Sequence, residues 1–210
     1  MKSTAYGREE RVADGVVHLL GVSVGIIAVI VMMVSAVMLS RPPIAVSLGI
    51  YGAGMLAMLG CSAAYNMNQL PKWDGILRRL DHAIIFLKIA GTYTPFAVIM
   101  GGIAGYLLLG FVWTTAIIAA VGKLFRVHWK GLDIAIYLAL GWVGVLAYLP
   151  LSRVVPVPAI ALLAIGGVLY SVGVVFHLWR GLKYQNAIWH AFVLAATGCH
   201  FGAVTTAAFA

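Results

Sequence analysis

The 210-residue chain is 63% hydrophobic and only 10% charged, with a mean hydropathy of +1.02. Because soluble domains carry about 25% charged residues, this composition excludes a soluble globular protein. A net charge of +8 would favour a nucleic-acid partner in a soluble chain. Here the basic residues lie in short loops between apolar runs, so we expect membrane topology to explain them and no nucleic acid to bind.

Seven apolar stretches are long enough to cross a bilayer as helices, which takes about 20 residues each. We therefore predict an all-α polytopic membrane protein, in which residues 1–210 form a single domain built as a seven-helix bundle. The acids that precede the first span, Glu9, Glu10 and Asp14, are interpreted as a solvated helix start, where carboxylates suit the helix dipole. The predicted spans are residues 15–39, 44–65, 80–100, 102–122, 133–149, 157–179 and 188–208.

The distribution of Lys and Arg predicts how the spans are oriented. The side that holds the N-terminus and the loops after the second, fourth and sixth spans carries 11 of the 14 basic residues. The other side carries Arg41 and Arg153, and Lys88 lies within the third span. Since cytoplasmic loops carry the excess of basic residues, we predict a cytoplasmic N-terminus and an external C-terminus.

Polar side chains from four spans lie in the half of the bilayer that is predicted to face the cytoplasm. Polar groups inside a membrane are costly, so their coincidence at one depth predicts a shared polar cavity. The alternative is a set of polar helix interfaces, since Asn and His also bond across helices. The residues are His18 of the first span, Ser62 and Asn66 of the second, Asp81 of the third, and Asn186 and His190 of the seventh.

Lys88 is a cation inside an otherwise apolar run. On a helix, Asp81, Lys88 and Thr92 fall on one narrow stripe, so the two opposite charges should face a partner or water. One hypothesis is that the Lys88 ammonium pairs with Asp81. The other is that Lys88 snorkels or meets another polar group of the bundle.

Two further histidines are supporting candidates. His18 would carry protons or bond a backbone carbonyl of the bundle. His200 lies ten residues beyond His190, on roughly the same helix face. A relay through His18, His190 and His200 is a weaker hypothesis that follows from this arrangement.

Several motifs resemble the haemolysin III family. They are ERVADGVVHLLG at residues 10–21, LDHAIIFLKIAGTYTPF at 80–96, ALGW at 139–142, GGVLYSVGVVFH at 166–177 and NAIWHAFVLAATGCHF at 186–201. The resemblance covers nearly the whole chain. This family belongs with the progestin and adipoQ receptors, a wider group that also includes alkaline ceramidases.

The resemblance implies a zinc site near the cytoplasmic side of a seven-helix fold. Its ligands are a His in Ser-x-x-x-His ending the second span and two His in His-x-x-x-His opening the seventh. An Asp at the start of the third span holds water at the metal. This chain retains Ser62, Asp81 and His190, but Asn66 and Asn186 stand where the other two ligands belong. Because an amide oxygen is a poor zinc ligand, we predict a degenerate zinc site.

Two functions follow as alternatives. The first is a non-catalytic membrane protein with a sensor, receptor-like or lytic role, in which Lys88 supplies the positive charge that a metal once gave. The second is a metal-dependent intramembrane hydrolase of a lipid amide or ester, with Asp81 and Ser62 as catalytic residues. Both place the protein in a bacterial inner membrane with membrane lipid as its partner.

Overall fold

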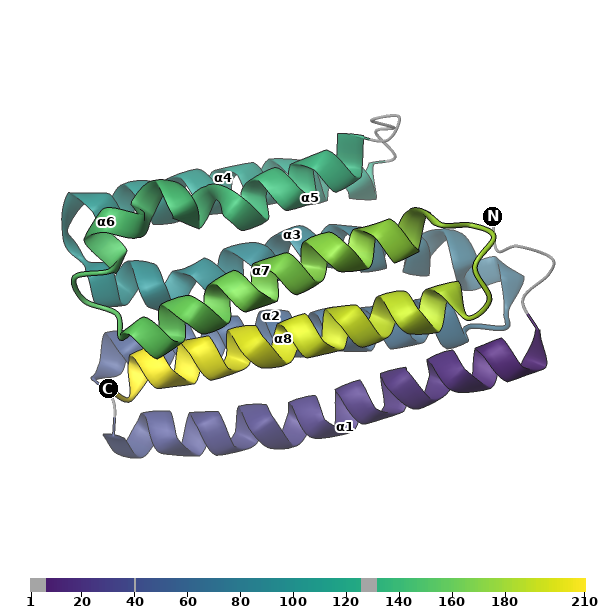
Figure 1. The fold of residues 1–210 in the computed structure, drawn as a ribbon, viewed down its shortest axis with the longest axis horizontal. Coiled ribbons are helices and arrows are strands. Elements are labelled where there is room, and N and C mark those ends of the chain that lie inside the picture. The colour runs from purple at the N-terminus through teal and green to yellow at the C-terminus, as the bar shows by residue number, and fades with distance from the viewer. Residues whose placement is uncertain (1–6, 40, 126–131) are drawn as a thin grey trace.

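The computed structural model describes residues 7–39, 41–125 and 132–210, and the regular structure of these residues is entirely helical (Figure 1). Seven helical spans in this part of the chain are long and apolar enough to cross a membrane, which confirms the predicted all-α seven-span fold. The chain is therefore a multi-pass membrane protein. The helices are α1 (Arg8–Leu39), α2 (Pro42–Met67), α3 (Pro71–Met100), α4 (Gly102–Leu124), α5 (Leu132–Trp142), η1 (Val143–Ala147), α6 (Tyr148–Leu151), α7 (Val157–Leu178) and α8 (Gln185–Ala208).

The fifth span, Leu132–Leu151, consists of α5, the 3₁₀ helix η1 and α6 in succession, so the seventh span is α8. Helix α3 begins at Pro71 rather than at residue 80, where its apolar run begins. The first turns of α3 are helical, but they are too polar for hydropathy to assign them to a membrane span. Asp81 consequently lies inside α3, not at its start.

Helix boundaries follow from proline and glycine chemistry. Prolines occupy the first turns of α2, α3 and α7, where the missing N–H needs no partner. Gly101 and Gly102 have φ values of +59° and +58° and form the tight turn between α3 and α4. Only glycine adopts that backbone conformation without steric penalty, so the turn depends on these two residues.

Helix α3 lies between two apolar clusters. One cluster joins it to α1, α2 and α8 around Tyr51 and Phe96, and the other joins it to α4 and α5 around Phe86 and Val112. The backbone of α2 approaches α3 closely at Gly54, where an added Cβ would lie 3.5 Å from the Cα of Lys88. Small residues permit such close helix contacts in membrane proteins.

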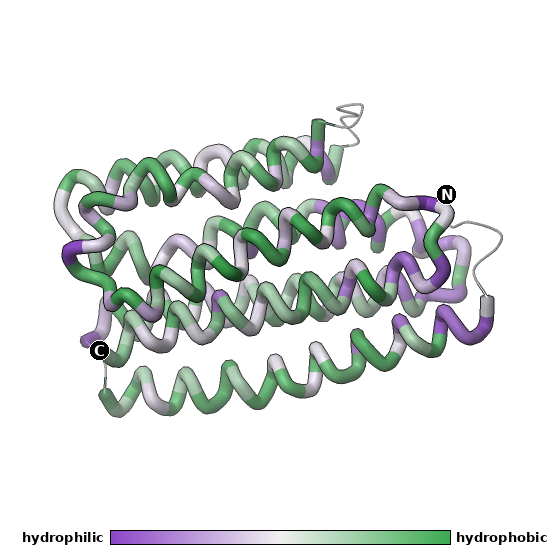
Figure 2. The backbone as a smooth tube through the Cα atoms, viewed as in Figure 1, coloured by the Kyte–Doolittle hydropathy of each residue, from purple (hydrophilic) through white to green (hydrophobic). Residues whose placement is uncertain are grey.

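Helices α1 and α8 start at the same end of the bundle and run in the same direction (Figure 1). Hydrophilic residues concentrate at this end, whereas hydrophobic residues predominate along most of the length of the helices (Figure 2). We call the end formed by the first turns of α1, α3 and α8 the polar end. Any polar site built from α1 and α8 is therefore reached from this end or from the surrounding lipid.

Candidate functional site

Helix α1 buries an acid and a histidine one turn apart. Asp14 is 1% exposed and His18 is 7% exposed, and their spacing of four residues puts both side chains on one face. The interpretation of Asp14 as part of a solvated helix start is therefore wrong. A carboxylate removed from water must be paired, so its neighbours decide what it does.

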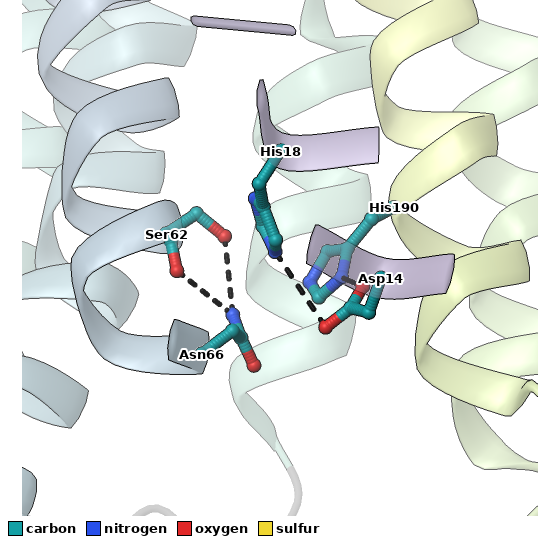
Figure 3. Close-up of polar contacts among 5 residues, drawn as sticks. All are labelled: Asp14, His18, Ser62, Asn66 and His190. Atoms are coloured by element: carbon teal, nitrogen blue, oxygen red, sulfur yellow. Dashed lines mark hydrogen bonds and ion pairs between the residues drawn. The ribbon is translucent and has the colours of Figure 1, made fainter. Parts of the chain in front are cut away.

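Both carboxylate oxygens of Asp14 face imidazoles. Oδ1 lies 2.6 Å from Nδ1 of His190 on α8, and Oδ2 lies 3.7 Å from Nε2 of His18 (Figure 3). The two histidine rings are 4.4 Å apart between centroids. Nε2 of His18 is buried and has no hydrogen-bond partner among the described residues. Buried polar atoms are nearly always bonded, so this nitrogen is suited to bind a group that the protein itself does not supply.

The three side chains form a compact set of metal donors. One ligand atom from each of Asp14, His18 and His190 lies within 4.8 Å of the others. Zinc binds imidazole nitrogen and carboxylate oxygen at about 2.0–2.2 Å, usually with four ligands. Donor chemistry, spacing and the unbonded nitrogen of His18 all fit one zinc ion with a coordination position left open.

A cavity of about 60 Å³ adjoins these donors, between α1, α2, α3 and α8. His18, His190, Ser62 and Asp81 are the polar residues among those that line it, together with Trp189. Its volume leaves room for an ion and a few water molecules. Most of the other lining residues are apolar, so the surroundings of such an ion would be largely dry.

Comparison with known proteins identifies the family. The sequence model described as "Haemolysin-III related" matches residues 7–201. The chain belongs to the haemolysin III family. It is similar to Hemolysin-3 of Bacillus cereus, with 34% identity over 92% of this chain and 89% of that protein. It is also similar to the Hemolysin-3 homolog of Bacillus subtilis (strain 168), with 34% identity over 92% of each chain.

A more distant relative is the human monocyte to macrophage differentiation factor, a protein of the progestin and adipoQ receptor group. It is 27% identical over 74% of this chain and 67% of its own length. The resemblance to the haemolysin III family is thus confirmed over most of the chain.

The two asparagines of this haemolysin III chain lie outside the converging donors. The Asn66 amide donates to the Ser62 backbone carbonyl at 3.0 Å and to the Ser62 hydroxyl at 3.4 Å, so its NH₂ group is engaged on its own helix (Figure 3). Asn186 does not line the cavity. Of the three positions expected at a zinc site, only His190 belongs to the donor set, and α1 provides the other two groups.

Lys88 belongs to a second polar cluster. Its ammonium donates to the Tyr170 hydroxyl of α7 at 2.8 Å and lies 3.5 Å from Nδ1 of His200 on α8. The Tyr170 hydroxyl is also 2.7 Å from the Thr197 hydroxyl. No ion pair joins Lys88 to Asp81 in the part of the chain that the structure describes, so the hypothesis of that pairing is wrong. The Lys88 side chain extends from α3 toward α7 and α8, and its ammonium contacts the hydroxyl and the ring of Tyr170.

His200 is separated from the Asp14 group. It contacts Lys88 and Tyr170, whereas the ring next to His190 is that of His18. Ten residues of helix correspond to about 15 Å of rise between His190 and His200. A continuous relay through the three histidines therefore has no support in this arrangement.

Asp14 is the residue that the sequence analysis missed. The available signal was the pair Asp14-x-x-x-His18 at the start of an apolar helix, since this spacing presents a carboxylate and an imidazole on one face. Its proximity to Glu9 and Glu10 concealed that signal.

Proposed function

We propose that this haemolysin III protein binds a zinc ion through Asp14, His18 and His190 and uses it to hydrolyse an amide or ester of a membrane lipid. The observation that carries the proposal is the buried, unbonded Nε2 of His18 beside an equally buried carboxylate and a second imidazole. On this view the zinc site is not degenerate. Its ligands have moved from the positions of Asn66 and Asn186 to α1.

The donor set favours zinc over other common divalent ions. Calcium and magnesium take oxygen ligands almost exclusively, whereas imidazole suits zinc. Two of the three donors here are imidazoles. The Asp14 carboxylate would neutralise part of the zinc ion's positive charge. This stabilises the site, because an uncompensated charge in a low-dielectric surrounding costs free energy.

Catalysis would use Asp81 and Ser62, which line the same cavity as His18 and His190. A zinc ion, when bound, supplies Lewis acidity that polarises a substrate oxygen. Asp81 would accept a proton as a general base, and Ser62 belongs to the same cavity lining. The apolar residues Met58, Leu59 and Leu194 restrict bulk water.

A lipid substrate is supported by an apolar groove between α1 and α2. The groove has a volume of about 380 Å³ and is lined by Gly15, Leu19, Val22, Ala63 and Met67. His18 lines both this groove and the inner cavity. An acyl chain lying in the groove would bring the lipid's polar linkage next to a proposed metal ligand.

Metal analysis of the detergent-purified protein tests the zinc site. We expect about one zinc per chain in the wild type and strong loss of zinc in His18→Ala and His190→Ala. His82→Ala is the matched control, because His82 is a half-buried histidine of α3 that does not line the cavity. Zinc-free wild-type protein after expression in zinc-replete medium would refute the site.

A non-catalytic zinc-binding sensor is the second candidate, and the cavity volume of about 60 Å³ favours it because no lipid head group fits there without helix movement. Zinc-loaded protein in lipid nanodiscs separates the two functions. The hydrolase predicts release of fatty acid from a lipid amide or ester, and loss of that release in Asp81→Asn. Full zinc loading without any hydrolysis across both linkage classes would favour the sensor.

A further inference from the structure

Glu10 joins the first turns of α1 and α8 through a single carboxylate. Its Oε1 accepts the backbone N–H of Tyr184 at 2.7 Å, and its Oε2 accepts the backbone N–H of Gly7 at 2.9 Å. Gly7 directly precedes α1, and Tyr184 directly precedes α8. One side chain therefore satisfies an N-terminal backbone donor of each helix.

The physical reason for this contact lies in the two helix starts. The first N–H groups of a helix have no partner within it, and the N-terminus carries a partial positive charge. Helices α1 and α8 start at the same end of the bundle, so two like partial charges lie near each other (Figure 1). The Glu10 carboxylate offsets both, and its bond to Gly7 has the geometry of the reach-back half of a capping box.

The backbone of Tyr184 is held in an unusual conformation at this contact. Its φ of +61° makes it the single non-glycine residue with positive φ in the described part of the chain. Its hydroxyl donates to Oε2 of Glu9 at 3.3 Å, and the ammonium of Lys183 lies 5.0 Å from the centre of its ring. Strained residues persist where surrounding contacts hold them, and they often do so near functional sites.

The joined helix starts set the position of the proposed ligands. Glu10, Asp14 and His18 follow one another at four-residue intervals on one face of α1. His190 lies six residues beyond Tyr184 in α8. Because the two helices run in the same direction, a bond between their starts fixes how far Asp14 and His18 lie along the bundle relative to His190. A shift of one residue is about 1.5 Å, and metal sites tolerate about 0.5 Å.

We propose that Glu10 is a positioning residue of the metal site, which sets the axial register of α1 against α8. This inference rests on the proposed function, since it concerns the same site. It adds a residue that touches neither the ion nor the substrate. Its prediction is that loss of the Glu10 carboxylate weakens metal binding without removing any ligand.

The experiment compares Glu10→Ala with Glu9→Gln, at an adjacent acid whose side chain is 78% exposed and whose amide oxygen can still accept from the Tyr184 hydroxyl. Zinc affinity is measured by chelator competition, and the geometry of the ligands by the visible absorption of the cobalt-substituted protein. We expect Glu10→Ala to weaken zinc binding by about tenfold, the lower end of the effect of losing a group that bonds a metal ligand directly, because Glu10 acts on the ligands through the helix backbone. We also expect it to change the cobalt spectrum, whereas Glu9→Gln keeps the wild-type spectrum and affinity.

Glu10→Gln serves as the conservative variant if the alanine variant does not fold. It retains one oxygen acceptor, so we expect intermediate affinity together with faster hydrogen exchange in the first turn of α8. Wild-type zinc affinity and exchange in Glu10→Gln would overturn the inference, and so would an unchanged cobalt spectrum in Glu10→Ala. Either result with zinc-loaded wild type leaves the proposed function standing, whereas zinc-free wild type would overturn both.

Discussion

At the scale of single residues, the arrangement around Asp14 explains why a carboxylate can lie inside an apolar bundle. Oδ1 is bonded to His190 and Oδ2 faces His18 at 3.7 Å, so an imidazole lies next to each oxygen. The pair with His190 at 2.6 Å has the length of a strong, charge-assisted hydrogen bond. In many zinc proteins a carboxylate orients a ligating histidine in this way, so Asp14 would orient His190 as well as serve the site as a ligand.

Asp14→Asn tests this role with little change of shape. An amide is a poor zinc ligand and a weaker acceptor from imidazole, so we expect zinc affinity to fall by about 10–100-fold. The measurement is chelator competition on the purified protein. Asn186→Ala is the control, since Asn186 is half-buried on α8 outside the cavity and should leave the affinity unchanged. Equal affinity of Asp14→Asn and wild type would exclude Asp14 from the site.

At the scale of helices, the Lys88 cluster connects α3 to α7 and α8 inside the bundle. Lys88 is 3% exposed, and its partners are the hydroxyl and ring of Tyr170 and the His200 imidazole. An unpaired charge in such a place is destabilising, so the Tyr170 contact compensates a penalty that Lys88 itself creates. Mutation of Tyr170 and mutation of Lys88 should therefore change the stability of the protein by different amounts.

We predict that Tyr170→Phe destabilises the protein more than Lys88→Met. Removing the hydroxyl leaves a buried ammonium with fewer acceptors and lowers the free energy of unfolding by about 1–3 kcal/mol. Replacing Lys88 by Met removes the charge, keeps an unbranched side chain, and leaves Tyr170 bonded to Thr197, so its effect should be below about 1 kcal/mol. Thermal unfolding in one detergent compares the variants. A greater loss of stability in Lys88→Met would mean that the ammonium itself stabilises the fold.

Close packing of α7 on α8 gives a second prediction at this scale. A Cβ on Gly166 would clash with the His200 ring and lie 3.2 Å from the Ala196 carbonyl oxygen, whereas a Cβ on Gly198 meets nothing within 4 Å. Overpacking typically costs about 1–3 kcal/mol, so Gly166→Ala should lower the unfolding temperature. Gly198→Ala should be neutral or stabilising, because alanine favours a helix over glycine. Equal unfolding temperatures for the two variants would show that His200 moves aside freely.

At the scale of the whole molecule, the features that hydropathy and spacing could predict are those that depend on one helix at a time. The seven spans follow from apolar length, and Ser62, Asp81 and His190 were placed at one depth by counting residues along their helices. What could not be predicted depends on several helices together. Lys88 lies on the same stripe as Asp81, but its direction depends on the position of α7. Asp14 is buried because α8 covers that face of α1, which no local pattern shows.

The orientation of the bundle is the remaining prediction, and it concerns the whole chain. In the sequence, the N-terminal segment and the loops after the second, fourth and sixth spans carry 11 of the 14 Lys and Arg. We therefore expect the polar end, with the proposed metal site, to face the cytoplasm in a bacterial inner membrane. A green fluorescent protein fused after Ala210 should then be dark and an alkaline phosphatase fused there should be active. The same reporters fused after Gln69, in the loop between α2 and α3, should give the reverse result. Bright fluorescence at Ala210 would contradict this orientation and would open the metal site toward the opposite side of the membrane.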